Sequence, residues 1–188
     1  MESVDKKGRT ALYLLAKNIN RNDINDIEER IVILHQKCPS LLNLPNNSGK
    51  TPLFRSISRI DRNSKKAIDI VSYFLDQDDI DLSVPDDFNI SKKASDKKPL
   101  VKYTSLLHVA CSQSIPMIVE KLIPKMRNYY NEKEKEENIF TQKNESGNTI
   151  LNIACSKRDL KTVDKIINYV MNPDNGIDYN NPDEFDIN

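Results

Sequence analysis

Glycine is scarce in this chain, with 4 residues among 188, and tryptophan is absent. Nucleotide enzymes commonly hold phosphate with closely spaced glycines that precede a helix. The few glycines here provide little material for such a loop. We therefore expect neither a nucleotide-dependent enzyme nor a bound cofactor.

Cysteine is also rare, and the three residues, Cys38, Cys111 and Cys155, form no CxxC pair. Structural zinc sites and small disulfide-linked domains need several cysteines at characteristic spacings. Three widely separated thiols fit neither class. We expect reduced cysteines and no metal site.

An excess of either charge is lacking, because 28 Lys and Arg residues balance 28 Asp and Glu residues. A neutral chain does not have the general attraction to phosphate backbones and anionic lipid that a basic protein has. The balance therefore predicts that the chain does not bind nucleic acid.

Long apolar runs are absent as well, and no stretch of the sequence approaches the roughly 18 residues that a membrane-spanning helix needs. The first seven residues, MESVDKK, lack the apolar segment of a signal peptide. These features predict an intracellular, cytoplasmic protein without membrane insertion.

What the sequence does contain is a repeated pattern. In its fullest form, an Asp or Asn is followed three residues later by Gly, five residues later by Thr, and then by Leu and small residues. The pattern covers residues 5–13, 46–54, 105–111 and 144–155. Apolar stripes with helical spacing follow it at residues 31–34, 70–75, 118–123 and 162–167. Each copy therefore predicts two helices.

The residues of the pattern have local physical reasons. Gly8, Gly49 and Gly147 stand where a tight turn needs a positive φ angle, which other residues adopt only at a cost. The following Thr, replaced by Ser105 in the third copy, is placed to cap the first helix. Pro52 stands at the first helical position, where its missing N–H is harmless.

The pattern and its spacing resemble the ankyrin repeat, a unit of about 33 residues. The resemblance implies an all-α fold, an ankyrin-repeat solenoid of about four helix-turn-helix repeats with β-turn finger loops and long insertions. We expect a single domain over residues 1–188. Its repeats cover approximately residues 5–45, 46–85, 100–143 and 144–183, with insertions at 19–26, 60–66, 87–102 and 128–139.

The sequence departs from the ankyrin pattern at several positions. Leu15 and Ile57 stand where a small residue is usual, and the third repeat lacks the turn glycine. The ankyrin pattern includes a His, and of the four repeats only the third keeps it, as His108.

Two features imitate catalytic motifs. Residues 44–51, LPNNSGKT, look superficially like a phosphate-binding loop, but Leu44 replaces the first glycine and Pro52 follows. His108 and Cys111 lie three residues apart, as in an activated thiol. We interpret the first as a repeat turn. In the second we expect a structural His and a small buried position that Cys111 shares with Cys155.

The resemblance implies a protein-protein interaction module, expected to be a monomer and not an enzyme, with no small-molecule substrate. In the family, residues beside the turn glycine and at the end of the first helix vary to suit the partner protein. Carried over to this chain, these partner-binding positions are Lys6, Lys7, Arg9, Lys17 and Asn18; Asn47, Ser48, Lys50, Ser58 and Arg59; Tyr103, Thr104, Ser112 and Gln113; and Glu145, Ser146, Asn148, Ser156 and Lys157. The first two groups are basic, so we expect them to prefer an acidic segment of the partner.

Other interpretations stay open at this point. The chain could be the substrate-recognition or targeting part of a larger enzyme whose catalytic domain lies outside it. Its irregular repeats and its Asn-, Ile- and Lys-rich composition are similar to ankyrin-repeat effectors that intracellular bacteria deliver into the host cytoplasm. A hydrolase that uses Cys111 or Cys155 is a third interpretation. The charged insertions 87–102 and 128–139 are either solvated extensions, the second continuing a helix with a Lys133–Glu137 pair, or recognition elements.

Overall fold

The computed structural model describes residues 3–20, 24–83, 105–132, 138–144, 146–178 and 180–181. Within these ranges the regular elements are α-helices and short 3-10 helices, and no strand is present. The prediction of an all-α fold is confirmed.

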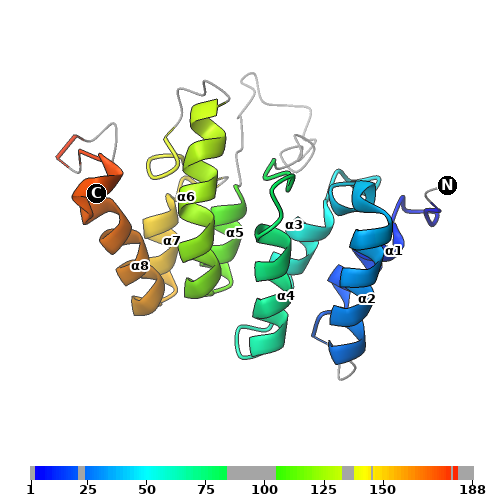
Figure 1. Ribbon diagram of the computed structural model, residues 1–188. Coiled ribbons are helices and arrows are strands. Elements are labelled where there is room, and N and C mark those ends of the chain that lie inside the picture. The colour runs from blue at the N-terminus through cyan, green and yellow to red at the C-terminus, as the bar shows by residue number, and fades with distance from the viewer. Residues whose placement is uncertain are drawn as a thin grey trace, which may run out of the picture. The chain divides into compact units, whose positions relative to one another are not determined.

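Contacts divide the chain into two compact units, Met1–Asp87 and Phe88–Asn188. Each unit contains two of the four predicted repeats, and the division falls at the start of the predicted insertion 87–102. Figure 1 labels the helices of both units. The single domain over residues 1–188 stays a prediction.

The first unit pairs helices of two kinds. Its elements are α1 (Ala11–Lys17), α2 (Ile24–Lys37), the 3-10 helix η1 (Pro39–Leu42), α3 (Pro52–Ile57) and α4 (Lys65–Leu75). The short helix of each repeat, α1 or α3, packs on the longer helix that follows it. The two short helices also contact each other, as do the two longer ones. The unit therefore has two layers, one of first helices and one of second helices.

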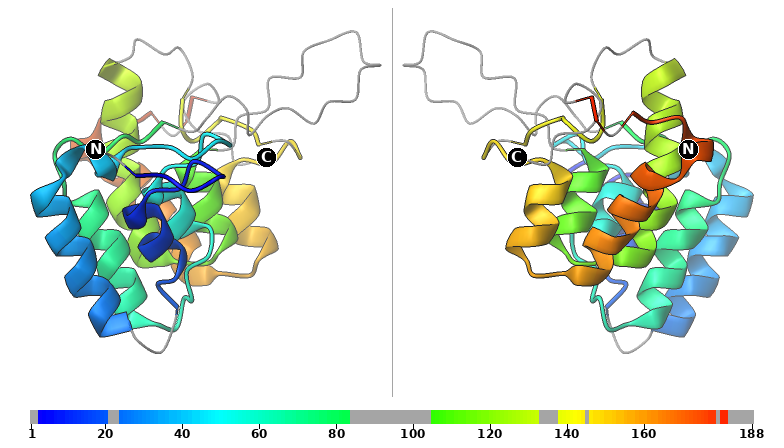
Figure 2. Two further views of the ribbon diagram at one scale, coloured as in Figure 1. Left: turned by 90° about the vertical axis from the view of Figure 1, so that its right-hand side faces the viewer. Right: turned by 90° about the vertical axis from the view of Figure 1, so that its left-hand side faces the viewer.

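The second unit has the same arrangement. Its elements are α5 (Leu106–Ser112), α6 (Pro116–Glu132), α7 (Ile150–Ser156), α8 (Leu160–Met171) and the 3-10 helix η3 (Pro173–Asn175). Here α5 packs on α6 and α7, while α8 packs on α6 and α7. Figure 2 shows the two layers within each unit from the side.

All four first helices begin at the predicted hydroxyl residue. The side chains of Thr10, Thr51, Ser105 and Thr149 each accept the backbone N–H of the residue three positions later. These hydroxyl groups are also buried, at 1–4% exposure of the residue. The caps satisfy N–H groups that a helix leaves unpaired at its start, which explains where these helices begin.

The core of each unit comes from the apolar residues of the repeat pattern. Leu12, Leu53 and Leu107, two residues after each cap, are fully buried in the first helices. Ile70 and Ile118 are buried at the start of the predicted stripes in the second helices. Because every helix presents such residues on one side, each layer covers the apolar side of the other.

The insertions between helices are only partly loops. We expected extra residues at 19–26 and 60–66, between the first and second helices. The structure places some of them in helix instead, because α2 begins at Ile24, seven residues before the stripe at Ile31. In α6 the stripe follows the helix start by two residues. The insertion 128–139 continues α6 as far as Glu132, and the Lys133–Glu137 pair lies outside the described residues.

The three glycines predicted to need positive φ have it, with values of 69° at Gly8, 69° at Gly49 and 76° at Gly147. Two of them differ in their surroundings. A Cβ on Gly8 would lie 2.0 Å from Asn47 Oδ1 and 2.8 Å from the Asn47 backbone nitrogen. A Cβ on Gly147 would meet no atom within 4 Å.

This difference provides a matched pair of substitutions. Gly147→Ala should lower the free energy of unfolding by about 1–2 kcal/mol, the cost of a left-handed backbone for a residue with a Cβ. Gly8→Ala should cost clearly more, because Asn47 must also move. Urea unfolding followed by circular dichroism measures both losses, and equal losses would contradict the predicted clash.

Candidate functional site

Three loops that precede first helices have the same hydrogen-bonded geometry, and we call them fingers: residues 5–9, 46–50 and 144–148. In each, the Oδ1 atom of the first residue, Asp5, Asn46 or Asn144, accepts the N–H groups of the residues two and four positions later, at 2.9–3.0 Å. The N–H of the same residue donates to the carbonyl four positions later, at 2.9–3.1 Å. The backbone of a finger is therefore held by its own first residue.

The tips of the fingers face solvent. Lys6, Lys7, Ser48 and Ser146 are exposed, as the partner-binding prediction requires. Asn47 is exposed too but also joins two fingers, because its backbone N–H donates to the Lys7 carbonyl at 3.0 Å. Its amide donates to the Lys6 carbonyl at 3.3 Å. The predicted contact residue Asn47 thus has a structural role as well.

The other predicted positions lie at the ends of the first helices. They are Lys17 and Asn18 at the end of α1, Ser58 and Arg59 just after α3, Ser112 and Gln113 at the end of α5, and Ser156 and Lys157 at the end of α7, all of them exposed or half-buried. The hydroxyls of the three serines donate to the carbonyl three residues earlier, at 2.7–3.0 Å. The structure therefore gives the helix ends equivalent places in the two repeats of each unit, and does the same for the finger tips of the first unit.

Some predicted positions cannot be placed. Tyr103, Thr104 and Glu145, together with the insertion 87–102, lie outside the described residues. Asn148, the last residue of the third finger, is half-buried, and its N–H is bound by Asn144.

The basic residues of the first unit differ in how far neighbouring groups compensate their charges. Arg9 is held by Asp5, with its Nε donating to Oδ2 at 2.7 Å and an ion pair of 2.5 Å from Nη2. This hydrogen bond to Arg9 lowers the pKa of the Asp5 carboxyl to about 2. Lys50 places its Nζ 5.8 Å from the centre of the Phe54 ring. Arg9 is thus largely compensated within its own finger, whereas Arg59 is exposed.

One charged residue of this region was missed by the sequence interpretation. Arg55 lies on α3 and is half-buried, and its Nε atom is buried without a hydrogen-bond partner. Burial lowers the pKa of its guanidinium, and the nearby cations Arg59 and Arg9 lower it further, while Tyr13 opposes the change. The pKa of Lys50 is also lowered, mainly by burial and to a smaller extent by the cations Arg55 and Arg59. Aligning the four first helices would have shown Arg55 as the one charged residue at its position.

The loop that imitates a phosphate-binding loop is the second finger. The N–H groups of Ser48 and Lys50 donate to Asn46 Oδ1, and the Gly49 N–H donates to the Asn46 carbonyl at 2.8 Å. A phosphate cradle needs such N–H groups to point at the ligand. Here they are already bonded within the finger.

His108 has the structural role expected of it. It is 1% exposed, and its Nδ1 accepts the Ser105 N–H at 3.3 Å, closing a capping box on α5. Its Nε2 lies 3.1 Å from the Gln142 carbonyl, so the proton sits on Nε2 and donates to that oxygen. Burial lowers its pKa from 6.5 to about 4, and the imidazole is neutral at physiological pH.

The cysteines differ from one another more than we expected. All three are free thiols in the structure. Cys111 is fully buried, and burial raises the pKa of its thiol well above the usual range. The prediction that Cys155 shares this buried position is wrong, because Cys155 is exposed. Cys111 lies on α5, and the next first helix, α7, packs against α5. Cys155 lies on α7, and among the described residues α5 is the one first helix that packs against α7. Cys155 therefore has no further described first helix to cover it.

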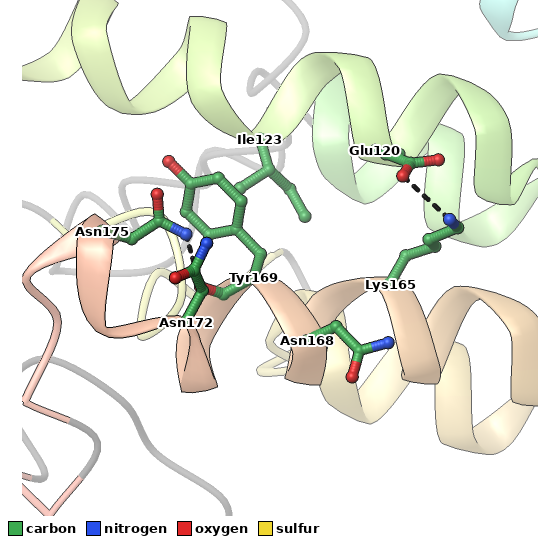
Figure 3. A pocket seen from close by; sticks show the side chains of 7 residues that line it. All are labelled: Glu120, Ile123, Lys165, Asn168, Tyr169, Asn172 and Asn175. Carbon is green, nitrogen blue, oxygen red and sulfur yellow. Dashed lines mark hydrogen bonds and ion pairs between the residues drawn. The ribbon is translucent and has the colours of Figure 1, made fainter.

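A cavity of about 290 Å³ lies among the second helices of the second unit (Figure 3). Lys165 of α8 donates to Glu120 of α6 at 2.8 Å on one side of it, and Tyr169 and Asn175 lie on the other. The Asn175 amide donates to the Tyr169 carbonyl at 2.7 Å. None of the predicted partner-binding residues lines this cavity.

Other kinds of site receive no support from the part of the chain that the structure describes. No group of three or more His, Cys, Asp or Glu side chains there could hold a metal ion. None of its helices combines the length and apolar character needed to cross a bilayer. No family model and no curated protein matches the chain.

His108 makes stability depend on pH. Above pH 6.5 the imidazole is neutral in both the folded and the unfolded chain, so His108 adds no pH dependence. As the pH falls from 6.5 to 4, the unfolded chain binds a proton that the folded chain does not. His108 should therefore lower the free energy of unfolding progressively over this window, by about 3 kcal/mol in total.

Urea unfolding at a series of pH values measures this loss. The matched control is His108→Asn, because Asn152 occupies the same position in α7 and closes the same capping box. The slope between pH 6.5 and 4 should be much smaller in this variant. An unchanged slope would show that His108 is not its source.

Alkylation of the folded protein should distinguish the thiols. Iodoacetamide should modify Cys38 and Cys155, which are exposed, and leave Cys111 unmodified until the protein is unfolded. Mass spectrometry of peptides identifies the labelled residues. Rapid labelling of native Cys111 would contradict its burial and would revive the thiol-enzyme interpretation.

Proposed function

We propose that this chain is an ankyrin-repeat protein whose fingers and first helices bind another protein. The observation that carries the proposal is the repeated finger. Three fingers share one hydrogen-bonded backbone, while the sequences at their tips differ: Lys6 and Lys7 in the first, Asn47 and Ser48 in the second, and Glu145 and Ser146 in the third. A constant backbone that displays variable side chains is suited to recognition.

The burial of the apolar residues in each repeat supports the same proposal. The apolar residues of the pattern are used in packing the layers of each unit, so specificity must come from residues outside the core. The finger tips and the ends of the first helices meet that condition in both units. Among the described residues, the helix ends have equivalent places in successive repeats of both units, and the finger tips do so in the first unit, as a surface built from repeats requires.

We propose binding instead of catalysis because the candidate catalytic residues are engaged in packing. The Nδ1 and Nε2 atoms of His108 are hydrogen-bonded to Ser105 and Gln142, within the capping box and the loop before the third finger. Cys111 is fully buried with a raised pKa, so its reactive thiolate form is suppressed.

Site-specific photo-crosslinking in the native cells tests this proposal. A photoreactive amino acid would replace Lys7, Ser48 or Ser146, one at a time, at the finger tips. The matched positions are Asp69 of α4 and Lys161 of α8, which are equally exposed but lie on second helices. We expect covalent protein adducts, resolved by mass spectrometry, from the finger positions and few from the second helices. Adducts only from the second helices would contradict the proposal.

A further inference from the structure

Arg55 occupies a position that is apolar in the other three repeats. Its backbone N–H donates to the carbonyl of the cap residue Thr51 at 3.0 Å. The same bond, from the residue four positions after the cap, is made by Leu14, Val109 and Ile153 at 3.0–3.2 Å. Val109 and Ile153 are 8% and 7% exposed and Leu14 is half-buried, so this position faces the packing of the repeats wholly or in part. An arginine there is desolvated where an aliphatic side chain would pack well.

The surroundings do not compensate this charge. The buried Nε of Arg55 has no hydrogen-bond partner, and no ion pair is present for its guanidinium among the described side chains. The charged groups that act on Arg55 are the cations Arg59 and Arg9, and Arg9 already holds Asp5. Lys50 is affected by both Arg55 and Arg59, so the three cations lie close together. Three neighbouring cations, one of them desolvated, form a site that an anion would stabilise.

The chemistry of the anion follows from the donors. A guanidinium is planar and weakly hydrated, and it pairs well with a carboxylate or phosphate. The cluster is small and belongs to a chain of zero net charge, whereas binding to a nucleic-acid backbone gains affinity from many cations over a long surface. The Phe54 ring near Lys50 is itself buried, so the cluster consists of a few cations without an extended surface. A few carboxylates of a peptide fit such a cluster better than a phosphate backbone does.

We propose that Arg55, together with Lys50 and Arg59, forms a carboxylate-binding subsite for an acidic segment of the partner protein. This inference rests on the proposed function and names the chemistry of the partner. The subsite lies between the second finger and the end of α3, within the proposed binding surface of the first unit. It also accounts for an arginine at a position where an apolar residue would be better for folding.

The proposal predicts opposite effects of one substitution on stability and binding. Arg55→Leu introduces the residue that α1 has at this position, at Leu14. The variant should melt about 2–4 °C above the wild type, because an uncompensated charge is removed. Its affinity for an acetylated hexaglutamate peptide, measured by fluorescence anisotropy at low salt, should fall about tenfold or more. The matched control is Arg62→Leu, which removes an exposed arginine that lies before α4.

Further measurements separate the outcomes. The Arg55 Nε–H resonance in NMR spectra should shift when the peptide is added, and hexaglutamine should produce no shift. Equal peptide affinity in Arg55→Leu and Arg62→Leu, or tighter binding of a hexanucleotide than of hexaglutamate, would overturn the subsite. If the peptide does not bind while the fingers still crosslink to a protein, this inference fails and the proposed function stands. If the peptide binds at Arg55 but no finger crosslinks, the proposed function fails.

Discussion

The capping of the first helices is the interaction on which each unit depends. These helices are six or seven residues long, too short to be stable in isolation. A buried hydroxyl at each start accepts an N–H that would otherwise be unpaired in the core. Thr10, Thr51 and Thr149 also directly follow the last residue of a described finger, so in these three repeats the cap connects the finger to its helix.

The fingers at the surface likewise depend on one side chain that binds nearby backbone groups. Asp5, Asn46 and Asn144 bind the backbone of their own loops, so the shape of a finger does not depend on its tip residues. Polar groups add further bonds near the fingers: Asn46 donates to the Tyr13 hydroxyl of the preceding repeat at 3.2 Å, and His108 donates to the Gln142 carbonyl within its own repeat. Under the proposed function, recognition and folding are therefore carried by different residues of one loop. Arg55 is the exception, because it stands in the packing layer and is costly there unless an anion is bound.

The burial of particular residues shows where sequence reasoning was sufficient and where it was not. The cap at Thr51, the left-handed glycine at Gly49 and the start of α3 at Pro52 depend on residues within one turn of each other, and all were predicted. The extension of α2 before its stripe and the exposure of Cys155 were not. Both depend on what packs beside a segment, and equal residues in successive repeats can have different neighbours.

The sequence by itself determined the all-α class, the starts of the first helices, the positive φ of the turn glycines and the positions of the finger tips. These follow from local chemistry: a hydroxyl three residues before an N–H, or a glycine where a Cβ would be strained. Only the tertiary structure decided that the Arg55 Nε is buried without a partner, that Asn47 joins two fingers, and that Cys111 and Cys155 differ in burial. Charge compensation and burial depend on distances between residues far apart in the chain, and those distances exist only once the helices have packed.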